Sequence, residues 1–545
     1  MATLFSGGSV FDGHRHLPGH DLLVDKGVVT SVVEGSQDHD GVEVVDLAGG
    51  LVAPGFTDAH CHPIQGGLEM MRCDLSEHST REAYLATIAS YAASHAGPWV
   101  LGGGWAMPAF PGGTPTAADL DSVVADRPVF LPNRDHHGAW VNTRALEAAG
   151  ITAATPDPPD GRIERLPDGS PSGTLHEGAM ALVSRLLPPT PAEAYAAGLR
   201  EGQRYLFSLG ITAWQDAIVG SYAGMDDSGP TYVDAVANGD LVADVVGALW
   251  WDRTLGLAQI PDLVARREAL SGGRFRATSV KIMQDGVLEN GTAALGTPYL
   301  DRCGHATDNA GHSFVAGEEL KDVVVALAAE GFQVHIHAIG DRGVREALDA
   351  FEAARAARGP EQSPDLRHHI AHLQLVHPDD VPRFGTLGVA ANAQALWACH
   401  EEQMTELTIP FLGPERATWQ YPFGGIHRTG GRLVMGSDWP VTSPDPLAAI
   451  HTAVTRTSYG EEGPAGSDPF LPEQALDLTT AFAAYTSGSA WVNGRDGRDG
   501  AGVLAPGHAA DLVVLDRDPF TGPPDEIGAT RVASTWVAGE RVFSG

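Results

Sequence analysis

The chain has 545 residues, of which 43% are hydrophobic, enough to bury a sizeable core in two or more domains or in one large barrel with insertions. Its formal net charge of −34 would repel phosphate backbones and acidic membranes, so we expect neither nucleic acid nor a membrane as a partner. The sequence has no run of about 18 apolar residues, no secretion-signal pattern at its start and four scattered cysteines, so we expect a cytoplasmic protein.

Both ends of the chain have the pattern of short β-strands. Apolar and polar residues alternate around turn residues in 21–29, and the same pattern returns in 510–515 and 532–539. We therefore predict a small β-sandwich domain built from both termini, residues 1–53 plus 490–545. Two unrelated β appendages are the alternative.

The middle of the chain, residues 54–489, alternates apolar strands with helices, which is the pattern of a parallel α/β sheet. Apolar residues at helical spacing are found, for example, in 318–330 and 342–357. Eight strands are predicted, and eight such strands close a (β/α)8 TIM-type barrel. They are expected at residues 55–60, 210–216, 243–250, 278–284, 332–337, 367–372, 388–394 and 432–438.

The segment 63–209 is too long for an ordinary connection between a strand and a helix of the barrel. It contains its own predicted strands, 98–105 and 128–133, together with helices. We interpret it as an inserted lobe over the mouth of the barrel.

The first predicted barrel strand ends with His60, Cys61 and His62. Residues two apart in a strand face the same way, so both imidazoles can reach one cation at the roughly 2.1 Å of a zinc–nitrogen bond. Alone, this spacing is not specific, and a pair of surface histidines is the alternative.

Three later predicted strands also end in groups that bind metals. His335 and His337 lie in one strand, His372 ends the next, and Asp438 ends the last. The carboxyl ends of barrel strands converge on one mouth, where active sites lie. Four histidines and one carboxylate at such positions predict a metal centre. We choose His337 over His335 as a ligand because it is nearer the end of its strand.

Lys281 lies within another apolar strand, where a charged ammonium is costly without a partner. One interpretation is an ion pair with an acidic residue. The other is chemical, because a lysine whose pKa falls on burial is nucleophilic and can take up carbon dioxide as a carbamate. A carbamate is an anionic oxygen ligand that can bridge two cations.

These motifs, in this order, resemble those of the metal-dependent amidohydrolases, and more closely the branch called amidohydrolase family 3, which includes N-substituted formamide deformylases. The resemblance covers essentially the whole chain, and the ordered combination is specific although no single motif is. The matching segments are 55–62, 280–281 with 285–286, 337–342, 371–374, 436–440 and 507–513, and His137, 140–142 and 173–177 resemble the inserted lobe of that branch.

The resemblance implies a set of metal ligands. Either one or two divalent ions would be bound, and zinc is the expected metal, although manganese, iron and nickel accept the same nitrogen and oxygen ligands. The ligands would be His60, His62 and Asp438 for the more buried metal, His337 and His372 for the second, and carbamylated Lys281 as the bridge between them.

The resemblance also indicates residues of the substrate pocket. From the lobe it implies His137, Trp140 and Glu177, and Trp105 and Trp439 would add apolar walls. Ordinary core packing is the alternative for each tryptophan.

The predicted function is hydrolysis of a C–N bond, in an N-substituted formamide or an N-acyl amine, by a metal-activated water. Asp438 would accept the proton of that water as general base and then deliver it to the leaving nitrogen. A deaminase, or a hydrolase of cyclic amides or esters, would use the same ligands and stays an alternative. A non-catalytic binding barrel would lack a ligand or the base, whereas every expected position is filled. The expected partner is a small-molecule substrate, with a homodimer as the default assembly.

Overall fold

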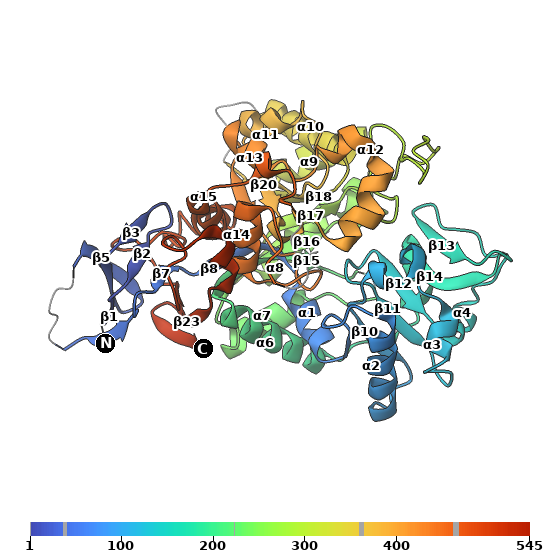
Figure 1. The fold of residues 1–545 in the computed structure, drawn as a ribbon, viewed down its shortest axis with the longest axis horizontal. Coiled ribbons are helices and arrows are strands. Elements are labelled where there is room, and N and C mark those ends of the chain that lie inside the picture. The colour runs from blue at the N-terminus through green and yellow to red at the C-terminus, as the bar shows by residue number, and fades with distance from the viewer. Residues whose placement is uncertain (1, 36–40, 223, 359–364, 461–467) are drawn as a thin grey trace.

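An eight-stranded parallel barrel forms the centre of the computed structural model (Figure 1). Each strand pairs with the next one of the barrel along the chain, as in a TIM-type barrel, which confirms the predicted barrel. The structure describes residues 2–35, 41–222, 224–358, 365–460 and 468–545. The barrel strands are β8 (Phe56–Cys61), β15 (Ile211–Val219), β16 (Asp244–Trp250), β17 (Phe275–Met283), β18 (Gln333–Ala338), β19 (His369–His372), β20 (Ala390–Ala393) and β21 (Leu433–Met435).

The barrel closes through the segment that follows β21. The Asp438 N–H donates to the carbonyl of His60 at 2.7 Å, and the His62 N–H donates to the carbonyl of Trp439 at 2.7 Å. These two bonds join the end of the last strand to the end of the first. The two segments that carry the histidine pair and the aspartate are therefore neighbours in space.

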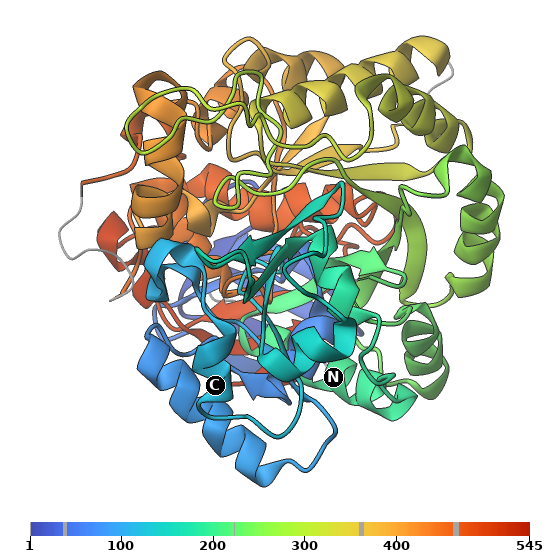
Figure 2. The same ribbon diagram turned by 90° about the vertical axis from the view of Figure 1, so that its right-hand side faces the viewer.

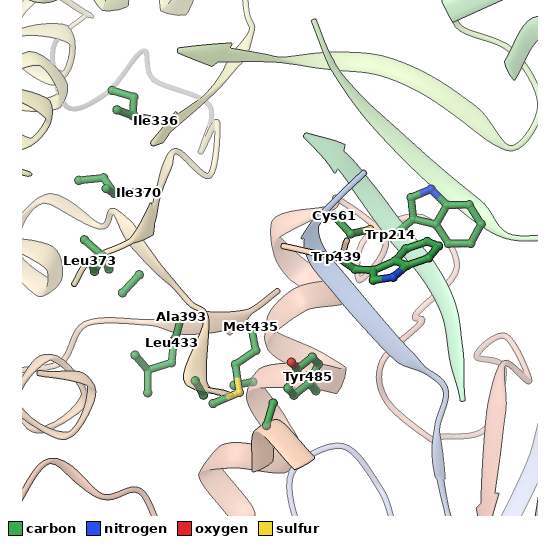
Figure 3. Close-up of a cluster of buried hydrophobic side chains, with 14 of the residues drawn as sticks. Cys61, Trp214, Ile336, Ile370, Leu373, Ala393, Leu433, Met435, Trp439 and Tyr485 are labelled. Atoms are coloured by element: carbon green, nitrogen blue, oxygen red, sulfur yellow. The ribbon is translucent and has the colours of Figure 1, made fainter. Parts of the chain in front are cut away.

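Helices surround the barrel because side chains alternate along each strand. In β18, His335 and His337 take part in the polar contacts of the barrel interior, whereas Ile336 packs in the hydrophobic cluster outside, as does Ile370 of β19 (Figure 3). The helices of this layer include α6 (Ala192–Ser208), α7 (Gly229–Asn238), α8 (Ile260–Leu270), α9 (Gly317–Ala329), α10 (Asp341–Arg358), α11 (Val381–Leu387), α13 (Phe423–Arg428) and α14 (Pro446–Thr455). Helices α9 and α10 begin and end within one residue of the predicted helices.

A second sheet, inserted between β8 and α6, lies in front of the barrel mouth (Figure 2). It has its own hydrophobic clusters and three helices, α2 (Arg81–Ser94), α3 (Ala117–Asp121) and α4 (Thr143–Ala149). Its strands, in spatial order, are β13 (Gly161–Arg165), β14 (Pro171–Glu177), β12 (Gly138–Val141), β11 (Val129–Pro132), β10 (Val100–Gly103) and β9 (Cys73–Asp74).

The two ends of the inserted segment pack in the hydrophobic core of the barrel. Ile64 and Leu68 of α1 (Pro63–Met70), and Leu199 and Leu206 of α6, belong to the hydrophobic cluster of the barrel. The predicted range 63–209 therefore includes two helices that complete the barrel, and the sheet of the lobe is confined to 73–177.

Strands from both ends of the chain share one sheet, because β22 (Leu512–Leu515) pairs with β7 (Leu51–Pro54). Phe5 and Trp536 contact each other in a cluster between this sheet and a second one. That these sheets form a separate sandwich domain stays a prediction. The first sheet has the order β24 (Glu540–Ser544), β23 (Val532–Val537), β22, β7, β2 (Ser9–Phe11) and β3 (His16–Pro18), and the second has β5 (Val28–Glu34), β4 (His20–Asp25), β1 (Thr3–Ser6) and β6 (Glu43–Asp46).

Among the described residues, none of the helices has the length and apolar character that crossing a membrane requires.

Candidate active site

Two histidines and one aspartate meet where β8 and β21 end. The Nε2 atoms of His60 and His62 each lie 3.0 Å from Oδ1 of Asp438. The three side chains are close enough together to hold one metal ion. Asp438 has a φ of 61°, in the left-handed region, because the chain turns sharply out of β21 at this point. Such backbone outliers in non-glycine residues concentrate at functional sites.

Three further predicted ligands surround this group. The Nζ atom of Lys281, on β17, lies 3.3 Å from Nε2 of His60, and Nδ1 of His372, at the end of β19, lies 3.9 Å from Oδ2 of Asp438. The ring of His337, on β18, contacts the ring of His372 with 4.4 Å between centroids. The structure thus brings all six predicted ligands together at the carboxyl ends of five strands.

The chemistry of these groups fits a bound divalent cation. Nδ1 of His62 and Nδ1 of His372 are buried and have no hydrogen-bond partner among the described residues. Burial lowers the pKa of His60 to about 3 and keeps the pKa of His372 well below the usual value, so both imidazoles are neutral. Neutral imidazoles with free lone pairs are the form of histidine that binds metals.

The acid and the amine of the site also have perturbed pKa values. Burial alone would raise the pKa of Asp438, but the surrounding imidazoles, among them His62 with Nε2 3.0 Å from Oδ1, hold this pKa well below its usual value, so the side chain is a carboxylate. Burial lowers the pKa of the Lys281 ammonium to about 7, so a large share of the amine is uncharged at neutral pH.

One imidazole of the lobe reaches into the site. His137 Nδ1 lies 2.9 Å from Oε1 and 3.0 Å from Oε2 of Glu177, and the Thr292 hydroxyl donates to the same carboxylate at 2.8 Å. Burial would lower the pKa of His137, but the Glu177 carboxylate outweighs it and raises that pKa to about 9. His137 is therefore a cationic donor, with its ring 5.5 Å from that of His337.

All six predicted ligands line one cavity of about 50 Å³. His337, His372 and Asp438 also line a second cavity, of about 90 Å³, together with His137. A third cavity, of about 690 Å³, lies between lobe and barrel; none of the six ligands lines it, but it shares Tyr222, Trp250 and Met283 with the first. Sequence reasoning did not single out several other residues that line these cavities, because most of them come from loops and short turns without a periodic pattern, and Trp250 and Met283 come from the last positions of β16 and β17. They are Arg134, Glu289, Trp397 and Tyr421 in the second cavity, and Tyr222, Trp250 and Met283 in the third.

The three predicted tryptophans pack in cores and line none of these cavities. Trp105 and Trp140 are 1% and 0% exposed in the lobe, and their indole N–H groups donate to the carbonyls of Leu131 and Thr116. Trp439 is also buried and lies beside Cys61 and Trp214, outside the barrel strands (Figure 3). All three tryptophans therefore lie in hydrophobic cores, which was the alternative to their lining the substrate pocket.

Two buried aspartates hold the segments that carry the ligands, a role that sequence reasoning did not assign. Asp58 accepts hydrogen bonds from the backbone N–H groups of His60 and Ser437, both at 3.0 Å. Asp285 accepts from the N–H groups of Ile339 and Gly340 at 2.9 and 2.8 Å, directly after His337. The sequence signal that could have indicated this role is proximity to predicted ligands: Asp58 lies two residues before His60, and Asp285 lies four residues after Lys281.

Residues 43–543 match the sequence model of the "Amidohydrolase family". The chain belongs to this family. It is 31% identical to "Protein LONG AFTER FAR-RED 3" of Arabidopsis thaliana, over 92% of this chain and 84% of that protein. It is 26% identical to the "N-substituted formamide deformylase" of Arthrobacter pascens, over 91% of this chain and 89% of that protein. The structure of an uncharacterized metal-dependent hydrolase from Pyrococcus horikoshii shares the fold, with a TM-score of 0.72, 24% identity and coverage of 96% and 99% of the two chains.

Membership of the family makes the chain an amidohydrolase, a hydrolase that acts on carbon–nitrogen bonds. The fold and the family therefore agree with the function predicted from the motifs.

Proposed function

We propose that this amidohydrolase cleaves an amide-type C–N bond with the help of one or two divalent cations, zinc being the first candidate. The observation that supports this most directly is the meeting of four histidines, a lysine and a carboxylate, with unpaired nitrogens on His62 and His372. A cation bound there would lower the pKa of a water molecule and polarise a carbonyl oxygen. Its ligands would be His60, His62, His337, His372, Asp438 and the carbamate of Lys281.

Asp438 is the proposed general base. Its side chain is an anionic carboxylate that lines the cavity and contacts both His60 and His62. It accepts a proton from the attacking water through one carboxylate oxygen. The same group then delivers this proton to the leaving nitrogen, so that the amine departs uncharged.

Lys281 is proposed to carry a carbamate. Its amine, with a pKa of about 7, attacks carbon dioxide, forms a nitrogen–carbon bond and releases one proton. The reaction converts an uncharged amine beside His60 into an anion, which suits a site that holds divalent metal.

His137 is proposed to bind the substrate. Its ring lines the cavity of about 90 Å³ beside Asp438, and Glu177 holds it in position from the opposite side. A protonated imidazole in this place donates a hydrogen bond to the carbonyl oxygen of an amide and opposes the negative charge that develops there.

The proposed substrates are N-substituted formamides or other N-acyl amines. The full-length similarity to an N-substituted formamide deformylase supports this class. The cavity of about 690 Å³ between lobe and barrel shares Tyr222, Trp250 and Met283 with the cavity that the ligands line, so it offers room for a substituent on the amide. A deaminase or a hydrolase of cyclic amides or esters would use the same ligands, so such compounds belong in the screen.

The test is release of an arylamine from matched N-formyl and N-acetyl arylamines by protein supplied with zinc and bicarbonate. We expect Asp438→Asn to lower turnover by about 10²–10⁴-fold, the range of general acid–base catalysis. Asp379→Asn, at an exposed carboxylate outside the site, is the matched control and should leave turnover unchanged. Equal turnover in the two variants would contradict the role of Asp438, and no turnover of any acyl amine by the wild-type protein would contradict the substrate class.

A further inference from the structure

The barrel interior beneath the metal ligands is filled with polar side chains. Barrels of this kind are usually packed with branched apolar residues. Here Gln333 and His335 of β18, Gln215 of β15 and His369 of β19 are buried within the barrel and bonded to one another. Burying so many polar groups costs free energy unless each has a hydrogen-bond partner. The partners of each group determine how the side chains are oriented.

The network begins at Gln333, whose orientation is determined by backbone carbonyls. Its Nε2 donates to the carbonyls of Arg367 at 2.9 Å and Val492 at 2.7 Å. A carbonyl can only accept, so these two contacts identify the nitrogen of the amide. The Oε1 atom of Gln333 must then face Gln215, whose Nε2 donates to it at 2.9 Å.

The orientation of Gln215 follows from that of Gln333. Because the Gln215 nitrogen is directed at Gln333, its Oε1 atom faces the other way. That oxygen lies 2.7 Å from Nδ1 of His335 and 3.1 Å from Nε2 of His369. An amide oxygen can only accept, so each imidazole donates an N–H to it.

The tautomer of His335 then determines that of His60. His335 and His369 are fully buried and bond to side-chain amides, and His335 also bonds to the imidazole of His60, so each ring is uncharged and has a single N–H. His335 uses its N–H on Gln215, which leaves its Nε2 as an acceptor. Nδ1 of His60 lies 2.9 Å from this atom and must supply the proton.

His60 therefore presents a lone pair on Nε2 to the site. This atom lies 3.0 Å from Oδ1 of Asp438, which is also an acceptor. Two acceptors at this distance repel each other unless a positive charge lies beside them, which the Lys281 ammonium, 3.3 Å from Nε2 of His60, or a bound metal cation supplies. The network thus prepares His60 for a cation at the position where Asp438 can share it.

We propose that Gln333, Gln215 and His335 form a positioning chain that holds His60 in the Nε2-coordinating tautomer and fixes its ring for metal binding. This inference rests on the proposed metal-dependent function. The three residues touch neither substrate nor metal and act only through His60. Partners of this kind, which bond the second nitrogen of a ligating histidine, raise metal affinity by about 10–100-fold in other proteins.

The neighbouring strand offers a matched control for His335. His369 is the register partner of His335, is equally buried and donates to the same oxygen of Gln215. Its other nitrogen bonds to Asn392 and not to a predicted ligand. If the network had a purely structural role, replacing either histidine should have the same effect on metal binding. The positioning chain includes only His335, so only its replacement should weaken metal binding.

The experiment compares zinc affinity, measured by competition with a chromogenic chelator, and the visible absorption of the cobalt-substituted protein. We expect His335→Leu to weaken zinc binding by about 10–100-fold and to change the cobalt spectrum. His335→Gln, whose side-chain oxygen can still accept from His60, should restore most of the affinity. His369→Leu should keep the affinity and the spectrum of the wild-type protein.

A further pair of variants covers the case in which His335→Leu does not fold, as judged by circular dichroism. His335→Asn can still bond to Gln215 but is too short to reach His60, so it should bind zinc more weakly than His335→Gln. Equal zinc affinity in His335→Leu and His369→Leu, or in His335→Asn and His335→Gln, would overturn the positioning chain. A wild-type protein that binds no metal would overturn the proposed function itself, together with the inference that rests on it.

Discussion

Replacing Asp58 by alanine should open the junction that closes the barrel. Asp58 is 0% exposed, and its Oδ1 accepts from the N–H groups of His60 and Ser437, both at 3.0 Å, while Oδ2 accepts from the Ser437 hydroxyl at 2.5 Å. In Asp58→Ala the two backbone N–H groups lose their acceptor inside the protein. Each such orphan costs about 1–3 kcal/mol, so the free energy of unfolding should fall by about 2–6 kcal/mol.

Asp58→Asn is the matched control. The asparagine oxygen can still accept from both N–H groups, and its NH2 group can donate to the Ser437 hydroxyl. Because burial raises the pKa of Asp58 to about 7, the side chain is only partly ionised at neutral pH, and the cost of Asp58→Asn should stay at or below about 1 kcal/mol. Urea unfolding of the metal-free proteins, followed by circular dichroism, measures both values. An equal free energy of unfolding for the two variants would refute the argument that the buried N–H groups depend on this acceptor.

Nη2 of Arg495 lies 2.6 Å from Oδ2 of Asp511, and the arginine side chain is only 3% exposed, so Arg495→Met should lower the free energy of unfolding by about 3–5 kcal/mol. Arg498→Met, at a side chain that is 39% exposed, should lower it by less than about 1 kcal/mol. Similar urea midpoints for the two variants would contradict this difference. Glu177→Gln removes the carboxylate that orients His137, so kcat/KM should fall by about 10²-fold while the amount of bound zinc stays constant. An unchanged kcat/KM would exclude a role of Glu177 in orienting His137. Dialysis against a chelator should abolish turnover and lower the thermal midpoint, with both recovered on adding zinc; a metal-free protein of full activity would be incompatible with the site.

The barrel could be predicted because its strands are apolar runs, five of which carry predicted metal ligands at their carboxyl ends. In β18, Ile336 faces the helices while His335 and His337 face inward, so the periodicity of a strand is enough to place the two histidines on one side. The convergence of His60 with Asp438, 378 positions apart, followed from the rule that barrel strands end at one mouth.

Other features could not be predicted because they depend on three-dimensional packing. Trp105 looks in the sequence like a candidate pocket wall, and only the fold of the lobe shows that its indole N–H bonds to a carbonyl in the core. The direction of the Gln215 amide depends on the carbonyls of Arg367 and Val492, which lie in distant segments. The packing of Ile64 and Leu68 of α1 in the barrel core likewise depends on the fold and could not be inferred from their apolar character.

The central claim is that the six convergent side chains hold a catalytic metal. Elemental analysis of protein purified without chelator, with Lys281→Ala alongside, tests it most directly. We predict one to two equivalents of a transition metal per chain in the wild-type protein and less in the variant, because Lys281 lies 3.3 Å from His60 at the centre of the ligands. A folded wild-type protein without metal, which gains no activity on adding zinc, manganese or iron with bicarbonate, would contradict the account.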